Sequence, residues 1–322
     1  MKKYKIAIIG ATGLVGQKIV QILFEEHITE KADLILYCSE KNANSYIDIF
    51  DTKLQVKKLD SLILKEKIDI ALFATNEEVS KKWSPLLAKN GAFVIDNSSA
   101  FRKNKIVPLV VPEINSHLIT SSIKIISNPN CSTIQLALPI NELSKIYEIE
   151  KIIVSTYQSV SGAGKNALLD LKYGKNNIIK ENIRENVISY IGKIDDKNFC
   201  LEENKMMFEL KKIISKPFTI YASCVRVPIP YCHTESVYVK FKQKIDIEKI
   251  SKVFDKNYLK LDEKLSLPTD VTDTNLTHIS RIRVLSDDEI MFFVTADNLR
   301  RGAAYNAVII AKIIIEKIFN KN

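Results

Sequence analysis

The chain has 322 residues, of which 46% are hydrophobic and 26% charged, and its formal net charge is +9. These proportions exclude wholesale disorder, and the length suggests two domains. No apolar run reaches the roughly 20 residues of a membrane span, so we expect no membrane contact. Lysines alternate with acidic residues and no arginine-rich stripe stands out, which disfavours nucleic acid as a partner. We expect no secretion signal, and five irregularly spaced cysteines favour reduced thiols in the cytoplasm.

In the first part of the chain, short apolar runs alternate with helical patterns. Strands are expected at 4–9, 33–38, 69–75 and 92–96, and helices from the glycine turn after residue 9 to about residue 26 and at 77–89. Strands that alternate with helices are typical of parallel βαβ units. This part therefore predicts a doubly wound α/β sheet.

The second part of the chain has a different pattern. It holds β-rich runs at 150–160, 218–229, 235–243, 280–285 and 290–296, and it ends in a long apolar helix from about 299 to 319. Such runs with helices between some of them predict a mixed or antiparallel sheet with helices on one side.

A glycine-rich turn follows the first strand and opens the first helix. Its residues are Gly10, Ala11, Thr12, Gly13, Leu14, Val15 and Gly16. Glycines at such a turn let the backbone approach a pyrophosphate, whose charge lies at the helix N-terminus. The turn predicts a dinucleotide site. After the second strand, Ser39 and Lys41 suit a 2′-phosphate while Glu40 suits a ribose hydroxyl, so these residues leave NAD and NADP open.

One cysteine has the setting of a nucleophile. Cys131 follows Ser-Asn-Pro-Asn and precedes an apolar helical run, which places its thiol at a helix N-terminus. The helix dipole there favours the thiolate, and backbone N–H groups can bind an oxyanion. Among the four histidines, His233 lies between two strand patterns and is the candidate partner. A Cys–His pair beside a dinucleotide fold suggests oxidation or reduction of an aldehyde through a thiohemiacetal.

Seven segments in this order resemble the aspartate-semialdehyde dehydrogenase family along nearly the whole chain. They are GATGLVG at 10–16, NSSAFR at 97–102, VPLVVPEIN at 107–115, SNPNCSTIQL at 127–136, STYQSVSGAG at 155–164, CVRVPIPYCHTESV at 224–237 and DNLRRGAAYNA at 297–307.

The resemblance implies a fold and an activity. The expected fold is α/β, with a Rossmann-type NADP-binding domain at 1–128 and 299–322 and an α+β catalytic and dimerisation domain at 129–298. The family reduces aspartyl 4-phosphate to aspartate 4-semialdehyde with NADPH and releases phosphate. These steps belong to lysine, threonine, methionine and diaminopimelate synthesis. We accordingly expect NADP, a cytoplasmic homodimer and no metal.

The resemblance also implies roles for single residues. Cys131 resembles the nucleophile, His233 the acid/base, and Gln158 the residue that orients the intermediate. Expected substrate contacts are Arg226 on the α-carboxylate, Arg102 and Lys212 on phosphate, Glu209 on the ammonium, and Asn130. Expected cofactor contacts, besides the glycine-rich turn, are Ser39, Lys41, Ser161, Gly162 and Asn298, with Asn130 also near the nicotinamide side.

The chain departs from the family pattern in three places. At residues 75–78 it reads TNEE, where the family tends to have small residues and glycines. After the second strand it reads SEKNAN, so that Lys41 stands where the family has arginine, and Cys232 is an unusual neighbour of His233. Two other functions remain open. A sister enzyme such as an N-acetyl-glutamyl-phosphate reductase would share the covalent chemistry, and a non-catalytic dinucleotide sensor would share only the fold.

Overall fold

A computed structural model describes residues 3–320. The chain divides into two compact units, one formed by residues 1–129 with 303–322 and the other by residues 130–302. We call them the terminal unit and the central unit.

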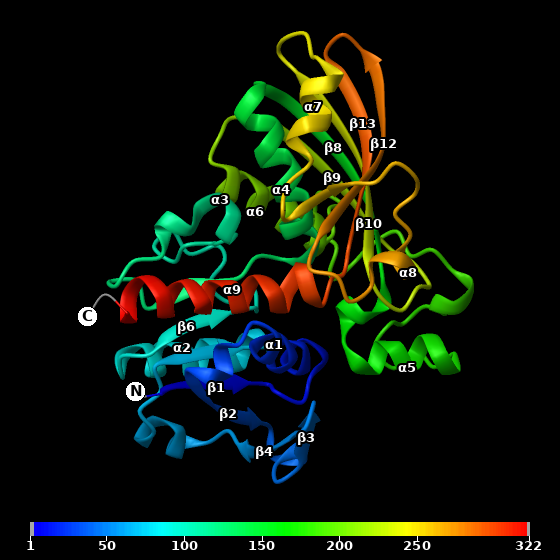
Figure 1. The fold of residues 1–322 in the computed structure, drawn as a ribbon. Helices are drawn as coiled ribbons and strands as arrows, with labels where there is room; N and C mark the ends of the chain where they lie inside the picture. The colour runs from blue at the N-terminus through cyan, green and yellow to red at the C-terminus, as the bar shows by residue number, and fades with distance from the viewer. Residues whose placement is uncertain (1–2, 321–322) are drawn as a thin grey trace. The chain divides into compact units, whose positions relative to one another are not determined.

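The terminal unit is built on a seven-stranded sheet with the order β3-β4-β2-β1-β5-β6-β7 (Figure 1). Its strands are β1 (Tyr4–Ile9), β2 (Ala32–Cys38), β3 (Tyr46–Ile49), β4 (Thr52–Lys58), β5 (Ile70–Phe73), β6 (Phe93–Asp96) and β7 (Ile125–Ser127). All neighbours run parallel except the β3–β4 pair, which is antiparallel. The order reverses at β1, and the carboxyl ends of strands at such a reversal are where ligands bind in open α/β sheets.

Helices cover both faces of this sheet. They are α1 (Leu14–Glu25), α2 (Glu77–Lys89), α3 (Pro112–Asn115) and α9 (Tyr305–Ile314). Alternate residues of β1 point to opposite faces. Ile6 and Ile8 belong to the core that contains α1 and α9, whereas Ala7 and Ile9 belong to the core that contains Trp83 of α2. The predicted doubly wound arrangement is therefore confirmed.

The central unit has a six-stranded sheet with the order β11-β12-β13-β10-β8-β9. Its strands are β8 (Ile149–Gln158), β9 (Thr219–Arg226), β10 (His233–Phe241), β11 (Leu259–Leu261), β12 (Thr277–Ser286) and β13 (Glu289–Ala296). Parallel pairs (β8–β9, β11–β12) and antiparallel pairs (β8–β10, β10–β13, β12–β13) are mixed, as the sequence predicts.

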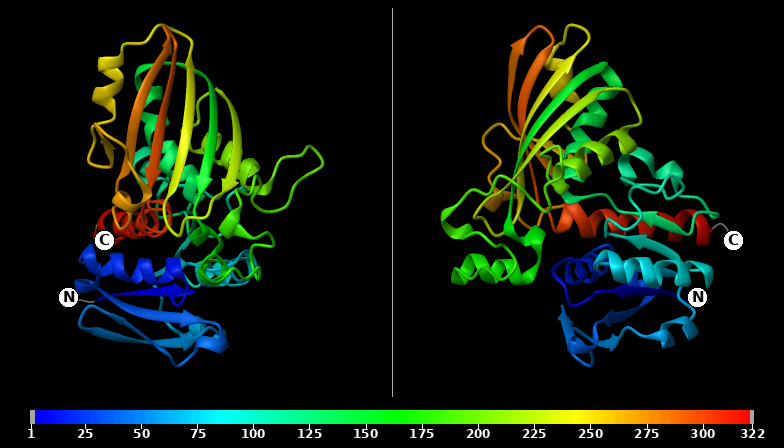
Figure 2. Two further views of the ribbon diagram at one scale, coloured as in Figure 1. Left: turned by 90° about the vertical axis from the view of Figure 1, so that its right-hand side faces the viewer. Right: turned by 180° about the vertical axis from the view of Figure 1, so that it is seen from behind.

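The helices that begin at Cys131, Leu201 and Ile247 gather on one face of the central sheet (Figure 2). The unit contains α4 (Cys131–Ile146), α5 (Lys165–Tyr173), α6 (Leu201–Ile214), α7 (Ile247–Val253) and α8 (Pro268–Val271). Helix α4 packs on β8 and β13, α6 packs on β9, and both α6 and α7 pack against α4. Along β8, buried and exposed side chains alternate, because one face meets these helices and the other does not.

The last helix differs from the expected uniform helix over 299–319. Helix α9 has regular geometry only from Tyr305 to Ile314, and residues 300–304 and 315–319 form π-helical turns on either side. Such turns are frequent at functional sites, and the first one contains Gly302, which packs against Cys131. Strands β3, β4, β7 and β11 were also not expected from the sequence.

Between residues 3 and 320, every helix is too short or too polar to cross a membrane. Over the same residues, His, Cys, Asp and Glu side chains form no group of three or more that would suit a metal ion.

Candidate active site

Three neighbouring strands of the central unit bring three of the predicted site residues into a row. Gln158 ends β8, and it is in register with His233, which opens β10, and with Arg226, which ends β9. Residues that face each other across a sheet point to the same side. The row is nearly inaccessible to solvent, since Gln158 is 1%, His233 0% and Arg226 7% exposed. These residues, far apart in sequence, thus form one end of the sheet.

Cys131 is the first residue of α4 and lies against this row. Asn130 caps the helix, because its Oδ1 accepts hydrogen bonds from the N–H groups of Ser132 and Thr133 at 3.0 and 3.4 Å. Gly302 packs on the other side, where an added Cβ would lie 2.8 Å from the Cβ of Cys131. Cys131 is half-buried, whereas the other four cysteines are fully buried. The predicted nucleophile therefore combines a helix N-terminus with access to a substrate.

The sulfur of Cys131 lies 3.3 Å from Nε2 of His233. The other ring nitrogen, Nδ1, accepts a hydrogen bond from the backbone N–H of Ser159 at 3.0 Å and lies 3.1 Å from the Ser159 hydroxyl. Burial, followed by the nearby Arg226 guanidinium, lowers the pKa of His233 to about 3. The imidazole is therefore neutral at physiological pH and is fixed in orientation from both sides.

The guanidinium of Arg226 faces the same small space. Its Nη1 donates to the Ser159 carbonyl at 2.5 Å. A Cβ added at Gly162 would lie 3.0 Å from this Nη1 and 3.4 Å from Nε2 of His233. Glycine at 162 thus leaves room beside both groups, and any larger residue would press on them. Burial lowers the pKa of Arg226, but the group stays charged because guanidinium starts far above neutrality.

Helix α6 holds the segment before Cys131 through two carboxylates. The backbone N–H of Asn130 donates to Oε2 of Glu209 at 2.6 Å, and the side-chain amide of Asn130 donates to Oε1 of Glu202 at 2.7 Å. Both carboxylates are almost fully buried. Burial alone would raise the pKa of Glu202. The charges of Lys205 and Arg226 and the hydrogen bond from Asn130 outweigh burial, so that the pKa of Glu202 is lowered. Glu202 is thus an anion at the site.

The Glu-x-x-Lys spacing has two candidates in the structure. Helix α6 contains this spacing twice, at Glu202/Lys205 and at the predicted Glu209/Lys212. The Glu202/Lys205 pair forms an ion pair of 3.2 Å, and Glu202 is the carboxylate that interacts with Arg226. Glu209 instead holds the Asn130 backbone, and burial lowers the pKa of Lys212. Glu202 and Lys205 were not among the residues expected at the site, although the repeated spacing is visible in the sequence.

Asn298 connects the remaining predicted residues of the central unit. Its Oδ1 accepts from the backbone N–H of Cys232 at 2.9 Å and from the Ser159 hydroxyl at 3.1 Å, and its amide donates to Ser161 Oγ at 3.0 Å. The Cys232 side chain points elsewhere, with its sulfur 3.3 Å from the Thr272 hydroxyl. Burial raises the pKa of Cys232 to about 12, so this second thiol stays protonated.

In the terminal unit, the glycine-rich turn has the geometry of a nucleotide cradle. Gly10 has φ +89°, and a Cβ there would lie 2.3 Å from the Ala74 carbonyl oxygen. A Cβ on Gly16 would lie 2.2 Å from the Gly10 oxygen, so both positions require glycine. Gly13 is the N-cap of α1 and offers no side-chain cap. The first N–H groups of α1 are therefore available to an anion.

The segment after β2 lies beside this cradle. The side-chain amide of Asn42 donates to the Thr12 hydroxyl at 3.3 Å. Glu40 pairs with Lys58 at 2.7 Å, and Ser39 and Lys41 are exposed to solvent. The carboxylate that would favour a ribose hydroxyl is therefore already neutralised by a lysine.

Arg102 belongs to the terminal unit, in the loop that follows β6. It is 6% exposed, and its Nη2 donates to the Asn97 carbonyl at 2.6 Å. Burial raises the pKa of Asp96 at the end of β6, and the positive charge of Arg102 lowers this pKa in part. A packed loop thus fixes this guanidinium.

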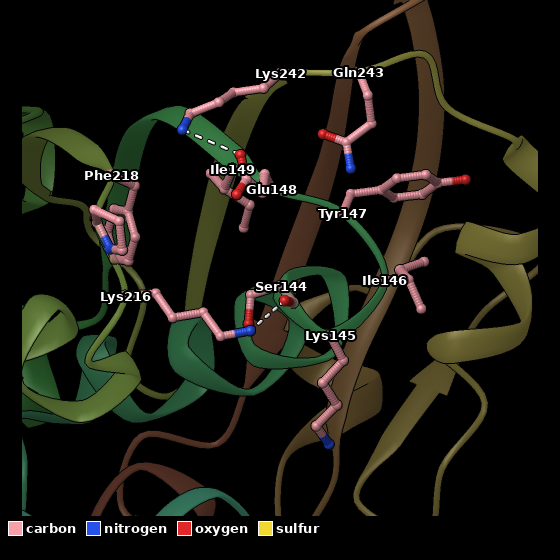
Figure 3. A pocket seen from close by; sticks show the side chains of 11 residues that line it. Ser144, Lys145, Ile146, Tyr147, Glu148, Ile149, Lys216, Phe218, Lys242 and Gln243 are labelled. Carbon is pink, nitrogen blue, oxygen red and sulfur yellow. Dashed lines mark hydrogen bonds and ion pairs between the residues drawn. The ribbon is translucent and has the colours of Figure 1, made fainter.

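A separate pocket lies at the opposite end of the central sheet, where β8 begins and β10 ends (Figure 3). It has a volume of about 320 Å³. Its lysines already have partners, since Lys216 donates to the Ser144 carbonyl and Lys242 pairs with Glu148 at 3.1 Å. None of the predicted site residues lines it.

Known proteins resemble this chain over its whole length. A family model described as "Semialdehyde dehydrogenase, NAD binding domain" matches residues 5–122, and one described as "Semialdehyde dehydrogenase, dimerisation domain" matches residues 139–301. A protein named aspartate-semialdehyde dehydrogenase from Campylobacter jejuni is 37% identical, and one of the same name from Aquifex aeolicus is 35% identical; each match covers 98% of both chains.

A solved structure agrees with these matches. The crystal structure titled aspartate semialdehyde dehydrogenase II complexed with ASA, from Vibrio cholerae, has a TM-score of 0.93 and 34% identity. It covers 99% of this chain, and the match includes 100% of that chain.

Proposed function

The chain belongs to the aspartate-semialdehyde dehydrogenase family, and we propose that it converts aspartyl 4-phosphate to aspartate 4-semialdehyde, with phosphate released. The observation that carries this proposal is the 3.3 Å contact between Cys131 and His233 at the N-terminus of α4, next to the Arg226 guanidinium. This arrangement suits covalent acyl transfer from a substrate that carries a carboxylate.

The residues of the site act in the following order. The Cys131 thiolate attacks the acyl carbon, a C–S bond forms, the C–O bond to phosphate breaks, and phosphate leaves with the electron pair and takes up a proton. When bound, a reduced nicotinamide supplies the hydride that the thioester carbon needs. The former carbonyl oxygen of the thioester then carries a negative charge, and Nε2 of His233 directs its proton at this oxygen. The C–S bond breaks last, which releases the aldehyde and regenerates the thiolate. Helix α4 directs its N–H groups at the same negative charge.

The terminal unit fits a dinucleotide. The cradle of Gly10, Gly13 and Gly16 leaves backbone space that a Cβ would fill, and the N-terminus of α1 has no side-chain cap. We propose NADP as the preferred cofactor, with Ser39 and Lys41 at the 2′-phosphate. The Glu40–Lys58 pair supports this assignment, because it keeps the one carboxylate of this segment occupied. In the central unit, Ser161, Gly162 and Asn298 are proposed to contact the nicotinamide end.

We expect kcat/KM to be higher with NADP than with NAD. Lys41→Met should reduce this preference roughly tenfold, because one cation near the 2′-phosphate is lost, equivalent to ~1.4 kcal/mol. Glu40→Gln is the matched control and should leave the preference nearly unchanged. Steady-state kinetics with both nucleotides measure the three ratios. A wild-type preference for NAD would overturn the assignment and place Glu40 on the ribose.

We propose that Glu202 and Lys205, rather than Glu209 and Lys212, contact the substrate. Glu202 lies beside the Arg226 guanidinium, so an ammonium and a carboxylate on one carbon atom can meet both residues together. Lys205 pairs with the second oxygen of Glu202 and is placed to meet the phosphate. Asn130 links Glu202 to the nucleophile through its amide.

Two lysine variants test this assignment. We expect Lys205→Met to raise the KM for phosphate by roughly tenfold or more, because a charge-assisted contact is lost. Lys212→Met removes the same charge about two turns further along α6. It should change the KM for phosphate less than about threefold. Kinetics in the phosphate-consuming direction give both values. The reverse ranking would restore the assignment of Glu209 and Lys212.

The substrate is tested by an absorbance assay for reduced nucleotide. We expect phosphate-dependent reduction of NADP with aspartate semialdehyde and little with N-acetyl-glutamate semialdehyde, since the buried Glu202 anion suits a free ammonium. Activity with the acetylated substrate alone would indicate the sister reductase. Activity with neither, in protein that binds nucleotide, would indicate a sensor.

We further propose that the chain forms a homodimer through the open face of the central sheet. The side chains of Ile153, Tyr157 and Tyr221 on this face are 45%, 39% and 51% exposed. Ile153 and Tyr157 belong to the interior strand β8, and Tyr221 belongs to the edge strand β9. The left view of Figure 2 shows this face. The match to a dimerisation domain over residues 139–301 supports a second copy as the occupant. A cytoplasmic location is proposed because all five cysteines are thiols and none is in a disulfide.

Ile153→Asp should convert the dimer to a monomer, because association would bury an unpaired carboxylate on both copies. Ile106→Asp is the control, since Ile106 is 81% exposed in the terminal unit. Light scattering after size-exclusion chromatography measures both masses. A dimeric Ile153→Asp variant, or a monomeric wild type, would contradict this surface.

A further inference from the structure

We infer that the backbone N–H of Ser159 holds His233 as the neutral tautomer protonated on Nε2, so that the positive charge facing the Cys131 thiolate is that of Arg226 and not an imidazolium. Ser159 is then a positioning residue. The inference rests on the proposed function for the roles of Cys131 and His233, but it concerns the resting protein and can be tested without turnover.

The tautomer follows from the partner of Nδ1. The backbone N–H of Ser159 points at Nδ1 from 3.0 Å, and a backbone N–H can only donate. Nδ1 must therefore accept, which leaves the single proton of a neutral ring on Nε2. The Ser159 hydroxyl lies 3.1 Å from both Nδ1 and Oδ1 of Asn298, and its single proton can be directed at either of these acceptors, so the hydroxyl does not fix the tautomer and the backbone N–H does. Nε2–H in turn faces the Cys131 sulfur at 3.3 Å and is placed to donate to it.

The same contacts disfavour an imidazolium. A proton on Nδ1 would face the Ser159 N–H at hydrogen-bond distance, donor against donor. His233 is 0% exposed, so bulk solvent does not stabilise the added charge. The positive charge of Arg226 from β9 also lowers the pKa of His233, whereas the negative charge of Glu202 from α6 raises it. On the flanking strands, Gln158 and Ala296 are uncharged.

Arg226 is the fixed charge that remains for the thiolate. The Cys131 thiolate and the Arg226 guanidinium interact electrostatically. Nη1 of Arg226 and Nε2 of His233 both lie within 3.4 Å of the position of a Cβ at Gly162, so the guanidinium is next to the Cys–His pair. An opposite charge at such range lowers a thiol pKa by about one to three units. Arg226 would thus have two functions, to bind the substrate carboxylate and to activate the nucleophile.

The inference is tested by alkylation of Cys131 with iodoacetamide, an uncharged probe, in the substrate-free protein. The rate should rise with pH through one ionisation. Arg226→Gln should lower the rate near pH 7 by about tenfold or more, whereas His233→Gln, which keeps an N–H donor, should lower it less than about threefold. Peptide mapping confirms that Cys131 is the labelled residue. The opposite ranking, or a rate profile with a plateau between two ionisations, would indicate a thiolate–imidazolium pair and overturn the inference.

A direct measurement of the ring protonation comes from ¹⁵N spectra of histidine-labelled protein, with His233→Gln used to assign the signals. We expect one protonated and one unprotonated ring nitrogen for His233, unchanged from about pH 5 to pH 9. Ser159→Ala keeps the backbone N–H and should leave these signals in place. Two protonated nitrogens near neutral pH would contradict the inference. The proposed activity would be untouched by that result, because either charge state supports attack by Cys131.

Discussion

Cys131→Ala is expected to lower turnover by at least about 10⁴-fold, because the covalent route through the thioester is lost and only binding and the oxyanion-stabilising N–H groups remain. The position of Cys131 as the first residue of α4, 3.3 Å from Nε2 of His233, is the physical reason. Steady-state reduction of NADP with aspartate semialdehyde and phosphate measures the loss.

Cys232→Ala is the matched control for this variant. Cys232 is the neighbour of His233 in sequence, but its sulfur contacts Thr272, and burial raises its pKa to about 12. The variant should keep at least about a tenth of the wild-type rate, a barrier change within ~1.4 kcal/mol. If Cys131→Ala remained active while Cys232→Ala did not, the nucleophile would be misassigned.

Arg226→Lys should lower kcat/KM by roughly 10²-fold or more, equivalent to about 2.7 kcal/mol. Lysine keeps the charge but loses the planar fork. In the structure, Nη1 of Arg226 already donates to the Ser159 carbonyl, and the rest of the guanidinium remains for a carboxylate. One ammonium cannot satisfy both partners with the same geometry, so binding and positioning should both weaken.

The size of this effect separates two roles for Arg226. A split of the loss between kcat and KM is expected if the residue positions the substrate as well as binds it. A variant within threefold of wild type would mean that Arg226 only supports the loop at Ser159.

Local signals explain what could be predicted of the fold. The first helix follows a turn whose backbone geometry requires glycine. Asn76 caps the start of α2, because its side chain accepts a hydrogen bond from the Val79 N–H at 3.0 Å. Both signals are contained in a few adjacent residues. Strands β7 and β11 have three residues each, which is too few for a periodic hydrophobic pattern. Their strand conformation is stabilised by pairing with β6 and β12, respectively. The π-helical turn at 300–304 includes Gly302, which packs against Cys131, and a contact between such distant segments is not visible in a local pattern.

In the candidate site, too, some features follow from adjacent residues and others from contacts between distant segments. Cys131 could be identified from its helix start alone, but its contact with His233 depends on strand register across the central sheet. The Glu-x-x-Lys spacing could not be resolved from sequence, because residues three and four apart on a helix share a face and both copies satisfy it. The electrostatic interaction of Glu202 with Arg226 is the observation on which we propose the first copy for the substrate. The role of Ser159 depends on a backbone N–H, which side-chain motifs do not reveal.

The central claim is that a thioester forms on Cys131, and intact-protein mass spectrometry tests it most directly. The protein is mixed with aspartate semialdehyde and NADP in the absence of phosphate, so that the acyl group cannot be released to phosphate, and is then quenched in acid. We predict one aspartyl acyl group per chain, located on the peptide that contains Cys131, and its loss when phosphate is added before the quench. An adduct on Cys232, an adduct that persists in Cys131→Ala, or no adduct in the absence of phosphate would contradict the mechanism.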